Sequence, residues 1–295
     1  MEMETLVGQG REAINMIIDP DSFQENVVGD LKVEDESFGP GAVIGTASLN
    51  GEDVTVIAND AMAFNEKFPV VFAGVIGMEE AYKMALAVYN SIKADEDKPV
   101  DKKRPIVLIV DTPGNGPGKV EEIFGMNKAT GSYQLSLAEA RKKGHPIVAM
   151  VIGRAISGAF LCHGLQADQI LALPKQFQTM IHVMPLTSIA RITKQDLERL
   201  EELSTTNPVF ASGADFFYQL GGLEEIVEQF DKMREKIISH IGEIRNFKSA
   251  GQYEKTGPWG RGLLGAEREG RAVRSKVIEQ MQKEFDSVAD KYISA

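Results

Sequence analysis

The chain has 295 residues, of which 43% are hydrophobic and 25% are charged, a composition typical of a globular protein with a sizeable core. Its formal net charge of −11 argues against non-specific binding to nucleic acid or to an anionic membrane, because both are polyanions. The only cysteine is Cys162, and neither a membrane-length apolar run nor a signal-peptide pattern occurs. An intrachain disulfide is therefore excluded, and a reducing, cytoplasmic location is predicted.

The first part of the chain predicts a helix, a β-hairpin and a second helix. Apolar residues recur at helical spacing over residues 6–18, and Asp19-Pro20 ends that pattern. The dipeptide Asn50-Gly51 between two β-rich runs is the strongest short-range signal for a hairpin. In chain order we expect a helix over 6–18, a polar loop over 23–38, strands over 42–49 and 54–59, a helix from residue 78 to 92 and a charged loop over 93–104.

The middle of the chain alternates short apolar strands with helices. Residues 105–110 read PIVLIV, as expected for a strand that is covered on both faces of a parallel sheet. Further strands are expected over 147–152 and 169–173, and helices over 136–143 and shortly after Gly153. This alternation predicts an α/β fold with right-handed crossovers, in which ligands bind beyond the carboxyl ends of the strands.

The last third of the chain predicts mainly helices. Expected helices cover residues 194–203, 211–220, 223–244 and 266–293, and Trp259 is expected in a glycine-rich loop over 251–265. Such a helical tail is suited to packing on a partner chain as well as on its own domain.

Two glycine-rich turns close neighbouring strands of the predicted sheet. Residues 111–118 read DTPGNGPG, without the Gly-Lys-Ser/Thr ending of a phosphate-binding loop, and residues 153–159 read GRAISGA. A helix that follows a strand abruptly leaves its first N–H groups without partners, so its positive end can hold a negative oxygen. Gly158 and Ala159 are small enough for a carbonyl to reach the main chain. We therefore predict an oxyanion hole with one N–H group from each turn, although each turn alone also fits ordinary turn chemistry.

Other polar residues allow more than one interpretation. Ser157 with His182 is a candidate nucleophile and base, but a hydroxyl at a helix start is as typical of a cap. His163 is expected to be an interior histidine. The basic clusters 102–104 and 141–143 fit solvated surface, or one of them meets the phosphates of a CoA-like arm. No metal is expected, because histidines and cysteine lack ligand spacing.

Several stretches carry a resemblance to a known family. GRAISGAFLCHGLQADQILA is similar to the glycine-rich turn and following helix of the crotonase superfamily, whose members stabilise thioester enolates with two backbone N–H groups. VDTPGNGPG followed by IGRAISGA resembles the paired motifs of carboxyltransferase subunits, and REAINMIIDPDSFQE resembles their N-terminal signature. The resemblance touches roughly residues 11–190, and the central part is most similar to the gamma-subunit family of biotin-independent malonate decarboxylases.

This resemblance implies a crotonase-like (ClpP/crotonase) α/β fold, a ββα superhelix with a helical C-terminal region. Residues 1–295 would form one carboxyltransferase-type domain, with an N-terminal helix and loop over 1–41 and a helical tail for partner packing over 223–295. Gly158 falls on the superfamily's central glycine, and the second oxyanion donor is expected at Gly114 or Asn115. The implied catalytic residues are Ser157, Gly158, Ala159, Gly114 and Asn115, and the implied substrate-binding residues are Gly116, Gly153, Ile156 and His182.

The resemblance also implies an activity. With a homologous beta subunit, such a chain decarboxylates malonyl-S-acyl-carrier-protein to acetyl-S-acyl-carrier-protein and CO2 through an oxyanion-stabilised enolate. The sequence has no convincing counterpart of the hydratases' catalytic glutamates, which suits decarboxylation better than water addition. The expected partners are the beta subunit, an acyl-carrier subunit with a phosphopantetheine-type, dephospho-CoA-derived arm, and an acyl transferase subunit. The chain itself is expected to bind no cofactor covalently and to be inactive alone.

Three other functions remain open at this point. The chain could be the carboxyltransferase subunit of a biotin-dependent enzyme, which avidin would inhibit. It could be a Clp-like serine hydrolase, in which a fluorophosphonate would label Ser157. It could also be a non-catalytic scaffold, with the reacting groups on the beta subunit.

Overall fold

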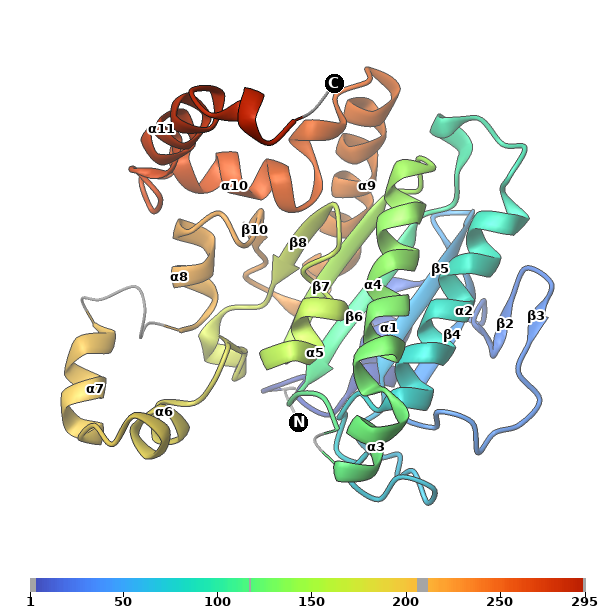
Figure 1. Cartoon of the computed structure of the whole chain (residues 1–295). Coiled ribbons are helices and arrows are strands. Elements are labelled where there is room, and N and C mark those ends of the chain that lie inside the picture. The colour runs from blue at the N-terminus through green and yellow to red at the C-terminus, as the bar shows by residue number, and fades with distance from the viewer. Residues whose placement is uncertain (1–3, 117, 206–211, 294–295) are drawn as a thin grey trace.

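A computed structural model of the chain describes residues 4–116, 118–205 and 212–293. Its centre is a twisted sheet with the strand order β1-β4-β5-β6-β7-β8-β10, and β9 pairs with the far end of β7 (Figure 1). The pairs from β5 to β10 are parallel, whereas β4 pairs antiparallel with β1 and β5. The strands are β1 (Gln24–Glu25), β2 (Val27–Val28), β3 (Leu31–Lys32), β4 (Ala42–Leu49), β5 (Glu52–Asn59), β6 (Ile106–Thr112), β7 (Ile147–Ile156), β8 (Gln169–Ala172), β9 (Met180–His182) and β10 (Glu225–Ile226).

Helices cover both faces of this sheet and make a three-layer α/β arrangement (Figure 1). Helices α2 and α4 contribute to one apolar core, and α1 and α9 contribute to the other. The helices are α1 (Gly10–Ile17), α2 (Met78–Ala94), α3 (Lys119–Phe124), α4 (Met126–Lys142), α5 (Ser157–Cys162), α6 (Leu186–Thr193), α7 (Leu197–Ser204), α8 (Ala214–Gln219), α9 (Met233–Ser249), α10 (Gly257–Glu267) and α11 (Arg274–Asp286).

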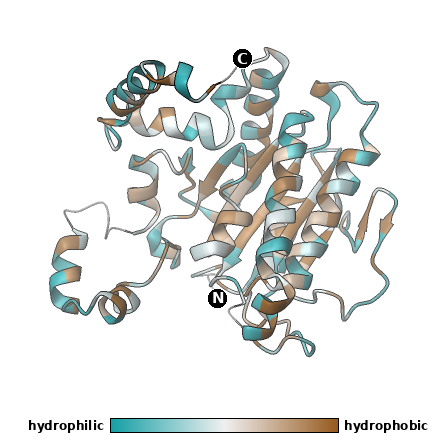
Figure 2. Cartoon of the chain, viewed as in Figure 1, coloured by the Kyte–Doolittle hydropathy of each residue, from teal (hydrophilic) through white to brown (hydrophobic). Residues whose placement is uncertain are grey.

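Strand β6 shows why the sheet is buried on both faces. Alternate side chains of a strand point to opposite faces, so Ile106 and Leu108 join the core under α2 and α4, while Val107 and Ile109 join the core under α1 and α9. Burying one such side chain fully is worth roughly 1.5–3 kcal/mol relative to leaving it in water. Figure 2 shows the result as hydrophobic strands between helices whose outer faces are more hydrophilic.

The predicted hairpin is confirmed. Strands β4 and β5 pair antiparallel along their whole length, and Asn50 and Gly51 have φ angles of +55° and +76°. Two consecutive positive φ values suit the tight turn that matches the twist of the flanking strands. The α/β alternation and the buried strands β6, β7 and β8 are confirmed as well.

The prediction of a loop over 23–38 was incomplete. Strand β1 pairs with β4, and β2 pairs with β3 in a small separate sheet. Each of these strands has two residues, which is too short for a periodic pattern to appear in the sequence. The helix predicted over 136–143 also starts earlier, because α3 and α4 occupy residues 119–142 with a left-handed Gly125 between them.

The C-terminal predictions were partly wrong. Residues 223–244 were expected to be one helix, but β10 extends the sheet beside β8 before α9 begins at Met233. The glycine-rich stretch 251–265 was expected to be a loop, but most of it forms α10, which contains Trp259. The helix expected over 266–293 is in fact the end of α10, a turn and α11. Residue 211, expected to start a helix, lies outside the described residues, and α8 begins at Ala214.

Across the residues that the structure describes, none of the helices combines the length and the apolar character needed to cross a bilayer.

Candidate active site

The two glycine-rich turns leave the same edge of the sheet, as predicted. Strands β6 and β7 are parallel neighbours, so their carboxyl ends lie side by side. The pairing is regular up to Val110–Val151 and resumes at Thr112–Ala155, so that β6 advances two residues while β7 advances four. Because of this bulge, β7 is longer than predicted and includes residues 153–156, the first part of the second turn.

The second turn changes from strand to helix within one residue. Strand β7 ends at Ile156, and Ser157, with a φ of +56°, is the first residue of α5. A left-handed serine is uncommon, and such strain concentrates at functional sites. The N–H groups of Gly158 and Ala159 lie in the first turn of α5, where backbone donors have no partner within the helix. The predicted donor at Gly158 is therefore placed at the start of a helix.

The backbone of the first turn is held by Ile76, which precedes α2. Gly114 has a φ of +141°, which favours glycine. Its carbonyl accepts the Ile76 N–H at 3.0 Å, and the Gly116 N–H donates to the Ile76 carbonyl at 2.9 Å. The Gly114 N–H donates to Thr112 Oγ1 at 3.3 Å. For the Asn115 N–H, in contrast, no acceptor occurs among the described residues. Of the two predicted donors in this turn, Asn115 is the one whose N–H group is available.

The two turns meet at Asn115 and Gly158. A Cβ atom on Gly158 would lie 2.3 Å from Asn115 Oδ1, so only glycine allows this approach. The Asn115 Nδ2 atom is buried and has no hydrogen-bond partner among the described residues. The space beside Gly114 is open, because a Cβ there would meet no atom within 4 Å. The available donors of the two turns therefore belong to adjacent residues, next to open space.

Asp111 and Arg154 tie the two turns together. Asp111 Oδ1 accepts hydrogen bonds from the backbone N and the Nε of Arg154, both at 2.8 Å. Asp111 Oδ2 accepts from Arg154 Nη2 at 2.8 Å and from the Gly8 N–H at 2.7 Å. A Cβ on Gly153 would lie 2.6 Å from Asp111 Oδ1, which explains the glycine. One buried carboxylate thus holds the end of β6, the second turn and the N-terminal segment in a fixed arrangement.

Ser157 and His182 are brought close but are not hydrogen-bonded. His182 is the register partner of Ile156, so its backbone lies beside the residue that precedes Ser157. Burial lowers the pKa of His182, and its Nδ1 is buried without a partner among the described residues. No hydrogen bond from Ser157 to His182, and no carboxylate bonded to His182, occurs in the described part of the chain. The pair therefore lacks the orienting acid of a catalytic triad.

Comparison with known proteins identifies the family. Residues 73–285 match the family model of the malonate decarboxylase gamma subunit. The chain belongs to this family. It is 66% identical over 288 residues to the malonyl-S-ACP:biotin-protein carboxyltransferase of Malonomonas rubra, covering 98% of this chain and 99% of that protein.

Solved structures confirm the crotonase-like carboxyltransferase fold that the motifs implied. A chain of the Pseudomonas malonate decarboxylase hetero-tetramer superposes with a TM-score of 0.66 and 28% identity, over 83% of this chain and 97% of that chain. A chain of transcarboxylase 12S superposes with a TM-score of 0.62 over 83% of this chain and 43% of that chain. Its identity of 22% shows a shared fold alone.

The interior polar residues of this gamma subunit are structural. His163, as predicted, is fully buried, with Nδ1 2.9 Å from the Tyr133 hydroxyl and Nε2 2.9 Å from the Ile109 carbonyl. Burial lowers the pKa of His163 to about 4 and raises the pKa of the Cys162 thiol to about 12. Both groups are therefore neutral near pH 7 and are poorly suited to acid–base or nucleophilic work.

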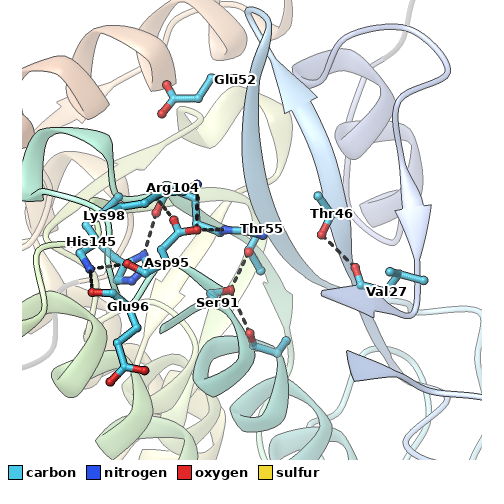
Figure 3. Close-up of polar contacts among 12 residues, drawn as sticks. Val27, Thr46, Glu52, Thr55, Ser91, Asp95, Glu96, Lys98, Arg104 and His145 are labelled. Carbon is cyan, nitrogen blue, oxygen red and sulfur yellow. Dashed lines mark hydrogen bonds and ion pairs between the residues drawn. The ribbon is translucent and has the colours of Figure 1, made fainter. Parts of the chain in front are cut away.

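The first basic cluster is also structural. Arg104 is buried against Asp95, whose Oδ2 accepts the Arg104 N–H at 2.6 Å and whose Oδ1 accepts from Nε at 3.1 Å (Figure 3). Lys103 donates to the carbonyls of Asp95 and Glu96. These contacts lie near the amino end of β6, the edge opposite to the two turns, so Lys103 and Arg104 are committed to the fold rather than to a phosphate.

Asp111 and Arg154 are the residues that the sequence interpretation missed. The signal was present, because an acidic residue directly after a fully apolar strand and an arginine inside the second turn both stand at the carboxyl edge. No group of three or more potential metal ligands occurs in the described residues. Five surface cavities of the described residues have linings that include neither turn.

Proposed function

We propose that this gamma subunit, together with a beta subunit, takes the free carboxyl group from malonyl-S-acyl carrier protein and leaves acetyl-S-acyl carrier protein. The observation that supports the proposal is the close approach of Asn115 to Gly158, where the Asn115 N–H has no acceptor among the described residues and the Gly158 N–H lies in the first turn of α5. The substrate comes from the relative in Malonomonas rubra, which is named for malonyl-S-ACP and is 66% identical.

The chemistry needs few side chains. When the bond between the carboxyl carbon and the methylene carbon breaks, its electron pair moves into the thioester carbonyl and makes an enolate. A fixed N–H group 2.7–3.1 Å from that developing oxygen stabilises the transition state by roughly 3–4 kcal/mol. Because the donors are main-chain groups, Ser157 and Ala159 can stand where many hydratases of the crotonase superfamily have glycines without loss of the hole. Ser157, Gly153, Ile156, Gly116 and His182 then shape the space around it.

The acceptor of the carboxyl group is the finer part of the proposal. We favour biotin on a separate carrier protein, because the 66% identical relative is a biotin-protein carboxyltransferase. In that reaction a new bond joins the biotin ureido nitrogen to the carboxyl carbon, and the proton from that nitrogen ends on the enolate carbon as part of the methyl group. Release of free CO2, with a proton supplied by water or an acid, is the second candidate, supported by the structural match to the Pseudomonas malonate decarboxylase.

A beta subunit is needed to complete the site. A decarboxylation site gains from excluding water, whereas the space beside Gly114 is open among the described residues. The Pseudomonas structures are a hetero-tetramer and a hetero-dimer, which supports a similar pairing here. We expect the chain to be inactive alone, to hold no cofactor covalently and to meet its substrate on the phosphopantetheine-type arm of a carrier subunit loaded by an acyl transferase subunit.

Co-expression with the beta subunit tests the proposal. The purified pair should convert a malonyl thioester to the acetyl thioester in the presence of the biotin carrier, and avidin should abolish that turnover. Turnover that is unchanged by avidin would assign release of CO2 instead. Failure of the pair to consume malonyl thioesters under either condition would overturn the function, and fluorophosphonate labelling of Ser157 would point to a hydrolase.

A further inference from the structure

One cavity, which neither turn lines, lies between helices α8 and α10 and the loop that follows α5. Its volume is about 330 Å³. Its walls include three arginines and an apolar side, and its lining residues are Leu165, Gln166, Phe217, Leu220, Gly221, Gly222, Pro258, Arg261, Gly262, Arg271 and Arg274.

This cavity has positive charge and no acidic residue in its lining. Each of the other four described cavities is lined by at least one aspartate or glutamate. Among the described residues, no carboxylate forms an ion pair with Arg261, Arg271 or Arg274. These three arginines therefore lie together around one cavity in a chain whose formal net charge is −11.

Backbone contacts hold these arginines in place. Arg261 donates from Nη1 to the Ala167 carbonyl at 2.8 Å, and it is fully committed to the loop after α5. Arg271 donates from Nε to the Leu220 carbonyl at 2.9 Å. The Arg274 guanidinium lies flat on Gly262, where a Cβ would be 2.8 Å from Nη2. The Nη groups of Arg271 and Arg274 have no acceptor among the described residues, so their donors remain for a ligand.

The nearby acids do not neutralise this charge. The Asp168 carboxylate is occupied by Lys248 Nζ at 2.6 Å and by the Ile147 N–H at 2.9 Å. Burial raises the pKa of Glu224 to about 7, so its negative charge is only partial near neutral pH. The second basic cluster of the sequence, residues 141–143, adds positive charge near the cavity, because Arg141 donates to the carbonyl of Gln166, a lining residue.

We propose that this cavity binds a phosphate ester. Planar guanidinium groups bind phosphate oxygens in pairs, and the donors of Arg271 and Arg274 are held ready for such contacts. Leu165, Phe217 and Leu220 give an apolar wall for the organic part of the ligand. The ligand is either a free phosphorylated small molecule or the phosphodiester of a carrier's arm. The site itself stands without the proposed function, and only the second source rests on it.

Inorganic pyrophosphate is the probe for the first test. Trp259 is the only tryptophan and follows Pro258, a lining residue, so we expect its fluorescence to respond to binding in the full chain. At constant ionic strength we expect a saturable change, and we expect Arg271→Ala/Arg274→Ala to weaken binding at least about tenfold, since each charge-assisted bond contributes a comparable factor. Arg271→Lys/Arg274→Lys keeps the charge but loses the paired contacts, so it should weaken binding less.

A matched control removes two positive charges from α11 outside the cavity lining. Lys276→Ala/Lys283→Ala changes two exposed residues outside the cavity and should leave the affinity unchanged. No saturable signal with pyrophosphate, or equal weakening by the lysine pair and the arginine pair, would overturn the proposal.

The complex with the beta subunit then distinguishes the two sources. If the arginine pair raises KM for malonyl carrier protein but not for malonyl-N-acetylcysteamine, which has no phosphate, the ligand is the carrier's arm. If both KM values stay unchanged while pyrophosphate binding is lost, the ligand is a free phosphorylated molecule. Absence of any turnover counts against the proposed function, and absence of pyrophosphate binding counts against the cavity, so the two failures are distinct.

Discussion

Replacing Asp111 by asparagine tests whether the two turns depend on one carboxylate. Asp111 accepts the Arg154 N–H, the Arg154 Nε and Nη2 groups and the Gly8 N–H at 2.7–2.8 Å. An asparagine side chain keeps one acceptor oxygen and turns an NH2 group toward donors on the other side. It also leaves the half-buried Arg154 charge without its partner.

The expected loss of stability is large, but it should leave the domain folded. Removing one partner of a buried ion pair costs about 3–5 kcal/mol. A domain with a stability of about 5–15 kcal/mol should stay folded at low temperature. The turns, however, should lose their fixed arrangement, and a donor displaced by about 1 Å can cost about 100-fold in rate. We therefore expect Asp111→Asn to lower both stability and kcat, with kcat reduced by about 10–100-fold per folded molecule.

Asp95→Asn provides the matched control at the opposite edge of the sheet. Asp95 is also buried and accepts from Arg104 and Lys98, so its loss should destabilise to a similar extent. It touches neither turn, and kcat should not change. Urea unfolding gives the stability of each variant, and malonyl-thioester turnover by the complex with the beta subunit gives kcat. Equal kcat losses in the two variants, or full activity in Asp111→Asn, would refute the positioning role.

Three further changes test other parts of the structure. Gly158→Ala should lower kcat by about 100- to 1000-fold with the fold retained, because the new Cβ would lie 2.3 Å from Asn115 Oδ1 and would push Asn115 away. Normal turnover would show that Gly158 is not part of the oxyanion hole. His163→Gln should flatten the pH dependence of stability: the folded pKa near 4 lies below the unfolded value of 6.5, so the contribution of His163 is complete above pH 6.5 and is lost as the pH falls toward 4. Urea unfolding between these pH values should show a slope smaller by about 1.4 kcal/mol per pH unit, and an unchanged slope would contradict this. Met281→Glu should weaken association with the beta subunit in pull-down, because α11 exposes Val277, Met281 and Phe285 at four-residue spacing, whereas Lys283→Gln on its other face should not.

The central fold could be predicted because local and tertiary signals agree there. The buried strand β6 is apolar at every position from Ile106 to Val110, and the β4–β5 turn has the residues that a tight turn needs. The strand–helix alternation then restricts the topology to few arrangements. In the same way, the two turns were found because glycine-rich segments stand directly after strands of this kind.

The errors lie where distant contacts decide the local structure. Four glycines make α10 a poor helix by propensity, at about 1 kcal/mol for each glycine relative to alanine. They are accepted because the helix packs backbone to backbone: a Cβ on Gly265 would lie 2.2 Å from the Leu220 carbonyl. Likewise, β10 is defined by pairing with β8 over two residues, which leaves no periodicity to recognise.

In the site too, local signals could be predicted from the sequence, whereas features that depend on folded contacts could not. The placement of Gly158 and the first turn at one edge of the sheet could be predicted from motif and position. Which N–H group of the first turn is available could not, because it depends on the folded contacts: Thr112 Oγ1 accepts the Gly114 N–H and the Ile76 carbonyl accepts the Gly116 N–H, which leaves the Asn115 N–H. The extension of β7 beyond Gly153 was not predicted because a glycine after an apolar run usually marks a break. Here the glycine instead gives room to the Asp111 carboxylate, which only the folded structure reveals.

An oxyanion hole made of main-chain N–H groups, as proposed here, fixes the class of intermediate but not the acceptor of the carboxyl group. Backbone N–H groups on a sheet edge stabilise an enolate oxygen whatever side chains surround them, so the turns predict the class of intermediate. Under the proposed function, we expect the carboxyl acceptor to be set by the subunit that covers the open space beside Gly114 and by the carrier that reaches it. The described residues of this chain leave that space open, so we expect the choice between biotin and release of CO2 to be made in the assembled complex. Changes in the turns should therefore alter the rate with either acceptor, and changes in acceptor preference should arise on the surface that meets the beta subunit.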